Sequence, residues 1–158
     1  MKTLIVYYSY EGTTKSLVEA IQKKYDFQAE QIEVVDEKKH KGLVKYVWGG
    51  RQVIQRKEPK IMELKSNLNE YDRILLGTPV WASSFAPAIR SFLKTYDLQN
   101  KEVGLFCTNK GGIGNTFVDF EEMLKGSKII GKVELTNVKH RKEECIKTIF
   151  NWIEKLNA

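Results

Sequence analysis

The sequence predicts an α/β protein, a three-layer α/β/α sandwich around a five-stranded parallel sheet. Short apolar runs rich in β-branched and aromatic residues alternate with segments of helical periodicity, in the order βαβαβαβαβα. The first, third and fourth runs are apolar without alternation, which is typical of strands buried on both faces. The 158 residues suffice for one hydrophobic core. We therefore expect a single domain over residues 1–158.

Five segments have the length and composition of strands. Their boundaries are predicted as Thr3–Tyr8, Gln31–Val35, Arg73–Gly77, Glu102–Thr108 and Lys128–Leu135. Parallel strands need crossover connections, and these are almost always right-handed. Helices should therefore cover both faces of the sheet.

Apolar residues spaced by three and four predict the helices. The stripes are Leu17, Val18, Ile21 and Tyr25; Ile89, Phe92, Leu93 and Tyr96; Phe117, Phe120 and Leu124; and Cys145, Ile146, Ile149, Phe150, Ile153 and Leu156. Pro87 suits the first turn of the second of these helices. A further helix, between the second and third strands, is ambiguous because Gly49 and Gly50 interrupt its pattern. The longest connection without a clear assignment runs from Arg56 to Tyr71.

Composition excludes several functional classes. Hydrophobic residues make up 42% and charged residues 29% of the chain, and no apolar stretch approaches the length of a membrane span. The net charge is +6, but the lysines are scattered and often lie beside glutamates, so we expect no nucleic-acid partner. Cys107 and Cys145 form no CxxC or zinc spacing, which favours reduced thiols in a cytoplasmic protein. His40 and His140 lie in polar, lysine-rich segments, so no catalytic Ser/His/Asp set is evident.

In an open parallel sheet, ligands bind beyond the carboxyl ends of the strands. The loop after the first strand, SYEGTT, places hydroxyls around Gly12 at the start of a helix, where free N–H groups attract anions. This pattern fits either a phosphate nest or an ordinary helix cap. It matches neither G-x-x-x-x-G-K-[ST] nor G-x-G-x-x-G, so it gives no support to ATP, GTP or a dinucleotide.

The loops after the third and fourth strands also contain candidate ligand-binding residues. The first of them, TPVWASSFAP, carries Trp81, which either covers the core or forms one wall of an aromatic ligand site. The second, CTNKGGIGN, has glycines that permit either a flexible turn or close approach of the backbone to a flat or phosphorylated ligand.

Taken together, the three loops resemble those of flavodoxins. Ser9, Gly12 and Thr14 match the S-x-x-G-x-T phosphate loop of that superfamily, TPVWA resembles the loop with its flavin-stacking tryptophan, and CTNKGGIGN occupies the place of its third loop. The resemblance covers nearly the whole chain. It implies a sheet order of 2-1-3-4-5 and FMN as the cofactor.

The same resemblance implies a role for each matched position. The phosphate of FMN would be bound, without a lysine clamp, by Ser9, Tyr10, Glu11, Gly12, Thr13 and Thr14. The isoalloxazine and ribityl groups would meet Thr78, Pro79, Val80 and Trp81, with the Trp81 ring stacked on one flavin face. The pyrimidine edge would meet Thr108, Asn109, Lys110, Gly111, Gly112 and Gly114.

The sequence departs from the flavodoxin pattern in three respects. The third loop has no aromatic residue for the second flavin face, so that face is either open to a substrate or covered by a residue such as Trp48, for which helix packing is the simpler interpretation. Ala82 follows Trp81 where many flavodoxins have glycine, which predicts weaker stabilisation of the one-electron-reduced flavin. Carrier flavodoxins are usually acidic, whereas this chain is basic, and Lys110 should favour an anionic reduced flavin.

The preferred prediction is an FMN-binding electron-transfer protein that works with redox partner proteins or NAD(P)H. An FMN-dependent NAD(P)H/quinone-type oxidoreductase is the alternative within the flavoproteins. A flavodoxin-like binding or regulatory module without flavin is the alternative from another class. The sequence leaves the oligomeric state open.

Overall fold

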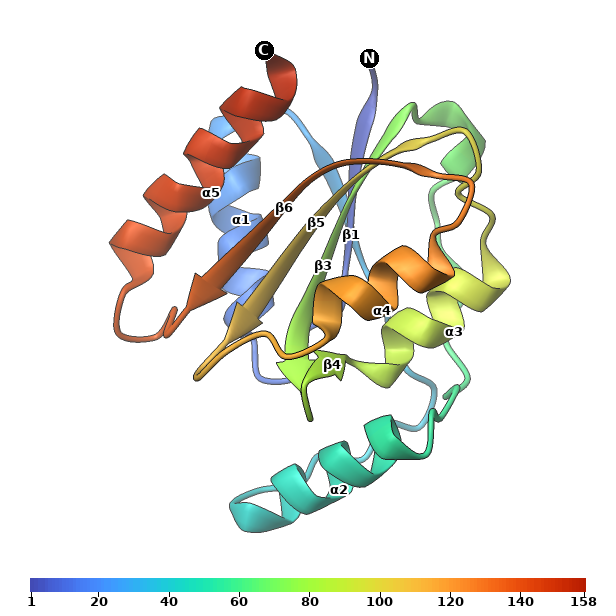
Figure 1. Cartoon of the computed structure of the whole chain (residues 1–158), viewed down its shortest axis with the longest axis vertical. Coiled ribbons are helices and arrows are strands. Elements are labelled where there is room, and N and C mark those ends of the chain that lie inside the picture. Colours follow the sequence, from blue (N-terminus) through green and yellow to red (C-terminus); the bar gives the residue numbers. More distant parts are fainter.

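A parallel sheet lies between two layers of helices in the computed structural model, which describes residues 1–158 (Figure 1). The parallel strands have the order β2-β1-β3-β5-β6. Their bounds are β1 Thr3–Tyr7, β2 Gln28–Gln31, β3 Arg73–Trp81, β5 Glu102–Asn109 and β6 Lys128–Thr136. The predicted fold class and the order 2-1-3-4-5 of the five parallel strands are thus confirmed. A short strand that was not predicted, β4 (Ser84–Phe85), pairs antiparallel with the end of β3.

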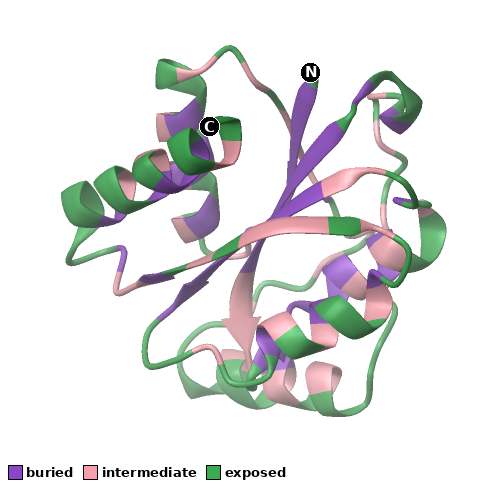
Figure 2. Cartoon of the chain, turned by 45° about the horizontal axis from the view of Figure 1, so that its top comes forward, coloured by how far each residue is buried: buried purple, intermediate pink, exposed green.

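The helices cover the two faces of the sheet in pairs (Figure 1). One layer consists of α1 (Thr13–Lys24) and α5 (Lys142–Asn157), and the other of α3 (Pro87–Thr95) and α4 (Thr116–Met123). A single 3₁₀ turn, η1 (Leu68–Glu70), precedes β3. The central strands are continuously buried because both faces are covered, and the exposed residues lie on the outer sides of the helices (Figure 2).

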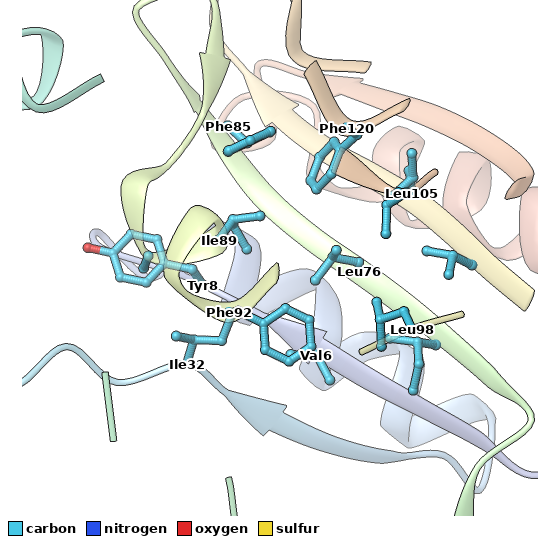
Figure 3. Packing of buried hydrophobic residues seen from close by; sticks show 14 of the residues in the cluster. Val6, Tyr8, Ile32, Leu76, Phe85, Ile89, Phe92, Leu98, Leu105 and Phe120 are labelled. Carbon is cyan, nitrogen blue, oxygen red and sulfur yellow. The ribbon is translucent and has the colours of Figure 1, made fainter. Parts of the chain in front are cut away.

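Each face of the sheet has its own apolar core. The core toward α3 and α4 includes Val6, Leu76, Phe92 and Phe120, which pack together between sheet and helices (Figure 3). The core toward α1 and α5 centres on the fully buried Phe106 and contains side chains of both helices. Together the two cores hold the carboxyl ends of β1, β3 and β5 at one edge of the sheet.

The predicted second strand, Gln31–Val35, is wrong in position. The observed strand is Gln28–Gln31, paired with β1 from Leu4↔Gln28 to Tyr7↔Gln31. The apolar residues chosen from the sequence instead follow the strand: Ile32 is buried, and Val34 makes an isolated antiparallel bridge with Ile61. The position of β2 is set by its pairing with β1. The apolar residues used for the prediction are apolar because they pack after the strand has ended, and they do not mark the strand itself.

The ambiguous segment between β2 and β3 does form a helix, α2 (Leu43–Ile54). It lies beyond the carboxyl ends of the strands, apart from both helical layers (Figure 1). Gly49 lies close to Trp81. A Cβ atom on Gly49 would be 3.4 Å from Cε3 of Trp81, which leaves no room for a side chain larger than a methyl group in that direction. Glycine therefore lets the helix backbone lie directly against the indole ring.

A tight hairpin turn holds Trp81 in place. Ala82 and Ser83, between β3 and β4, have φ values of 44° and 65°, as the central residues of a type I′ turn require. The Ser83 carbonyl accepts a hydrogen bond of 2.7 Å from the N–H of Asn115, and Ser84 donates its hydroxyl to Asp119. Positive φ values are unfavourable for alanine and serine. The hydrogen bonds from the segment before α4 and from α4 itself therefore stabilise this turn.

Candidate functional site

A cavity of about 470 Å³ opens beyond the carboxyl ends of β1, β3 and β5. This volume lies in the range of small-molecule and cofactor sites. The predicted residues that line it are Ser9, Tyr10, Glu11, Thr13, Thr14, Pro79, Val80, Trp81, Thr108, Asn109, Lys110, Gly111 and Gly112. The loop after β1, the end of β3 and the end of β5 with its following loop are thus brought to one cavity, and the segment TPVW, predicted as a loop, is the last part of β3.

The loop between β1 and α1 offers a set of unused donors. The backbone N–H groups of Tyr10 through Thr14 donate no hydrogen bond within the protein. Gly12 has a φ of 89°, a left-handed conformation that an L side chain adopts only with strain. The Ser9 hydroxyl accepts a hydrogen bond of 3.2 Å from the N–H of Lys15, and the Thr14 and Thr108 hydroxyl oxygens lie 2.9 Å apart. Such a cradle of N–H groups at a helix start suits an anion.

A carboxylate with three lysines lies in the same loop. Glu11 forms an ion pair with Lys45 of α2, and its Oε2 lies 3.7 Å from Nζ of Lys110 and 3.9 Å from Nζ of Lys139. The hydrogen bond from Lys45 is the main cause that lowers the pKa of Glu11, so its carboxylate is ionised at neutral pH. The fold thus brings lysines from α2, from the loop after β5 and from the loop after β6 to Glu11 in the loop before α1.

Aromatic side chains form one wall of the cavity. The Trp81 ring meets Tyr8, Tyr10 and Trp48 edge to face, with ring centroids 5.8, 5.5 and 5.7 Å away. Trp48, for which helix packing was the simpler interpretation, packs α2 against Trp81 and also lines the cavity. His40, although it lies in a polar, lysine-rich segment, is partly buried, with its ring centroid 4.9 Å from that of Trp48.

The loop after β5 presents an unpaired polar group. Asn109 is only 7% exposed, and its side-chain oxygen accepts a hydrogen bond of 2.9 Å from the N–H of Gly112. Its Nδ2 is buried and has no partner within the protein. An unsatisfied buried donor costs free energy, so a ligand with acceptor atoms at its edge would find a ready partner here.

Three predicted residues do not line the cavity. Thr78 is fully buried, and its hydroxyl accepts a hydrogen bond of 3.1 Å from the N–H of Ala86, which joins β3 to the start of α3. Gly114 lies against the hairpin turn, where a Cβ atom would be 2.3 Å from Cβ of Ser83. Gly12 borders a smaller hollow that also touches Thr13 and Lys139.

Two parts of the cavity wall were not predicted from the sequence. The first is the inner side of α2, and the second is the loop after β6. The further lining residues are Lys45, Tyr46, Gly49, Gly50, Asn137, Val138, Lys139 and His140, together with Ala82 of the hairpin turn and with Trp48, which the sequence offered as a cover for one flavin face. The glycine pair beside Trp48 was the available signal for α2. Nothing comparable marks the loop after β6, whose position follows from the N–H of Asn137, which donates to the Asn109 carbonyl at 2.9 Å.

Outside the cavity, the chain has two cysteine thiols as its candidate reactive groups. Burial raises the pKa of the Cys107 thiol to about 12, so this thiol stays protonated at neutral pH. Cys145 is also a free, buried thiol. No cluster of three or more His, Cys, Asp or Glu side chains is arranged to hold a metal ion. None of the helices combines the length and hydropathy that a membrane span requires.

Solved structures with the same fold include several flavoproteins. A protein of Bacteroides eggerthii described as a flavoprotein superimposes with a TM-score of 0.83 at 21% identity, covering 99% of this chain and 98% of that chain. A flavoprotein of Lactobacillus acidophilus, solved in complex with FMN, has a TM-score of 0.72 at 28% identity, over 90% and 97% of the two chains. Oxidised flavodoxin 1 of Bacillus cereus has a TM-score of 0.54 at 17% identity, over 98% of both.

Family membership rests on the sequence itself. No curated protein sequence matches the chain. The model of the flavodoxin family matches residues 2–156, which is almost the whole chain. The matched region contains every strand of the sheet and all the loops around the cavity. This chain therefore belongs to the flavodoxin family.

Proposed function

We propose that this protein binds FMN in the cavity at the carboxyl ends of β1, β3 and β5 and transfers electrons. The observation that carries the proposal is the coincidence of three features in one cavity: the free N–H groups of Tyr10 to Thr14, the Trp81 wall, and the unpaired Nδ2 of Asn109. These features match the phosphate, the flat ring and the polar edge of FMN. The FMN complex of the Lactobacillus acidophilus relative adds support.

The residues have separate tasks in this proposal. The N–H groups of the loop before α1 bind the phosphate, while Trp81 and Tyr10 exclude water from the ring. Asn109 donates from Nδ2 to an acceptor at the flavin edge. Bound FMN supplies the redox chemistry, since it accepts and releases electrons singly or in pairs. The protein holds the flavin and sets its electrostatic surroundings, in which Glu11 and its lysines contribute both signs of charge.

Titration of apo-protein with FMN tests the proposal. A variant with Trp48→Phe and Trp152→Phe leaves Trp81 as the single tryptophan. We expect FMN to quench its fluorescence and the visible flavin spectrum to shift, because the two rings come into contact. Protein that stays colourless and shows no quenching would instead favour the binding module without flavin.

A flavin-dependent reductase is the second candidate. It is favoured by the loop after β5, where Lys110, Gly111 and Gly112 line the cavity without any aromatic ring. That side of a bound flavin would be accessible to NAD(P)H or a quinone. Steady-state oxidation of NAD(P)H with a quinone acceptor separates the two functions: rapid turnover without a protein partner selects the reductase, and its absence selects the carrier with redox partner proteins.

A further inference from the structure

Helix α2 exposes its aliphatic side to solvent. Leu43, Val47 and Ile54 follow one another at helical spacing and are 82%, 72% and 79% exposed, and Val44 beside them is 60% exposed. The opposite side of the helix, with Trp48 and the buried Gly49, faces the cavity. We call Leu43, Val44, Val47, Arg51 and Ile54 the outer face of α2.

This exposure is concentrated rather than scattered. Four of the eight large hydrophobic residues that are exposed in the whole chain lie on the outer face of α2, and a fifth, Tyr46, lines the cavity from the same helix. Single apolar residues on a surface need no explanation, but an apolar face on one helix marks a contact surface. The other exposed large hydrophobic residues, Met1, Met62 and Val118, lie singly in the sequence, so only α2 has a continuous apolar face of this kind.

The charge around this face has one sign. Residues 38–57 contain seven lysines and arginines and no aspartate or glutamate. Lys39 pairs with Glu37, and Lys45 pairs with Glu11. The other five cations of this segment have no acidic partner within 4.0 Å; they are Lys38, Lys41, Arg51, Arg56 and Lys57. An aliphatic face with unpaired cations around it requires a partner that is apolar at its centre and anionic around it.

We propose that the outer face of α2 docks on an anionic lipid surface. Aliphatic side chains would enter the boundary between headgroups and acyl chains, while the flanking lysines and arginines contact lipid phosphates. A second copy of this chain fits poorly, because a two-fold contact on this face would bring the unpaired cations of both copies together. An acidic protein fits less well than lipid, because protein interfaces are poor in lysine and centre on aromatic anchors.

Docking would also orient the cavity. The inner side of α2 lines the cavity through Trp48 and Gly49, so a lipid surface on the outer face would lie one helix away from the cavity mouth. Docking itself requires no flavin. If the proposed function holds, this orientation would give the bound FMN access to electron acceptors dissolved in the membrane.

Vesicle co-sedimentation tests the proposal. Purified protein is mixed with vesicles of phosphatidylcholine alone or of phosphatidylcholine with phosphatidylglycerol, at low and high salt. The apolar variant is Leu43→Ser with Val47→Ser, and the charge variant is Lys41→Gln with Lys57→Gln. Val118→Ser on α4 is the matched apolar control, since Val118 is also 62% exposed, and Lys125→Gln with Lys155→Gln is the charge control.

We expect binding only to the anionic vesicles, with weaker binding at high salt. The apolar variant should lower the partition coefficient by about a hundredfold, and the charge variant by about thirtyfold, while both controls bind as the parent protein does. Circular dichroism checks that every variant is folded. Absence of binding to anionic vesicles would overturn the proposal, as would full binding by the apolar variant. A dimer in sedimentation equilibrium that the apolar variant dissociates would assign the face to a second copy instead.

Discussion

At the scale of single residues, Glu11 is the unusual member of the loop before α1, the proposed phosphate site, because a carboxylate there repels an anionic ligand. Its neighbours Lys45, Lys110 and Lys139 offset that charge. We expect Lys139→Ala to weaken FMN binding by about threefold to fivefold, the size typical of one exposed ion pair. Riboflavin, which has no phosphate, should bind the parent and the variant equally. Titrations with both ligands measure this difference.

Lys155→Ala is the control for the Lys139 prediction, since Lys155 is exposed at the far end of α5 and has no acidic partner. It should change neither affinity. If Lys139→Ala weakened riboflavin and FMN by the same factor, the lysine would act on the shape of the cavity, and the phosphate interaction assigned to it would be wrong.

Ala82 carries a local cost at the edge of the cavity. Its φ of 44° is favourable for glycine and strained for alanine. We expect Ala82→Gly to raise the free energy of unfolding by about 1 kcal/mol, measured by urea denaturation. In the FMN-loaded protein the same change should increase the one-electron-reduced flavin seen in a reductive titration. Ala20→Gly, in the interior of α1, is the control and should cost about 1 kcal/mol.

At the scale of elements, α2 depends on one close contact. Gly49→Val would place methyl groups against the Trp81 ring, which already lies 3.4 Å from the position of a Cβ atom. We expect this variant to move α2 away from the cavity and to increase hydrogen exchange of its amides. At Gly50 the nearest atom to a Cβ is 3.9 Å away, so Gly50→Ala should leave exchange unchanged or slower. Equal exchange in both variants would contradict the role of Gly49.

The elements also show what the sequence can predict. Buried strands such as β3 and β5 are evident from continuous apolar runs, because both of their faces are covered. The edge strand β2 was misplaced, since its residues are only partly buried and its register comes from β1. Loops after predicted strands could be assigned to the site from topology alone. The contributions of α2 and of Lys139 could not, because they depend on how distant segments pack around the cavity.

At the scale of the whole molecule, the register between the two central strands rests on a glycine. Gly77 of β3 is paired with Phe106 of β5, and the Phe106 ring occupies the space where a side chain at position 77 would lie. A Cβ atom there would be 2.1 Å from Cζ of Phe106, which is fully buried between the sheet and the helices α1 and α5. The ring therefore has little room to move.

We expect Gly77→Ala to lower the free energy of unfolding by about 2 to 3 kcal/mol, the upper part of the range for an overpacked core. Urea denaturation followed by tryptophan fluorescence and by far-UV circular dichroism measures it, and coincident curves would show that the whole molecule responds as one unit. Gly111→Ala, with no atom within 4 Å of its added Cβ, should stay within about 0.5 kcal/mol of the parent. Phe106→Leu shortens the opposing side chain, so the double variant should lose less than the sum of the two single losses. Strict additivity would mean that the cost at Gly77 arises from the backbone and not from the Phe106 ring.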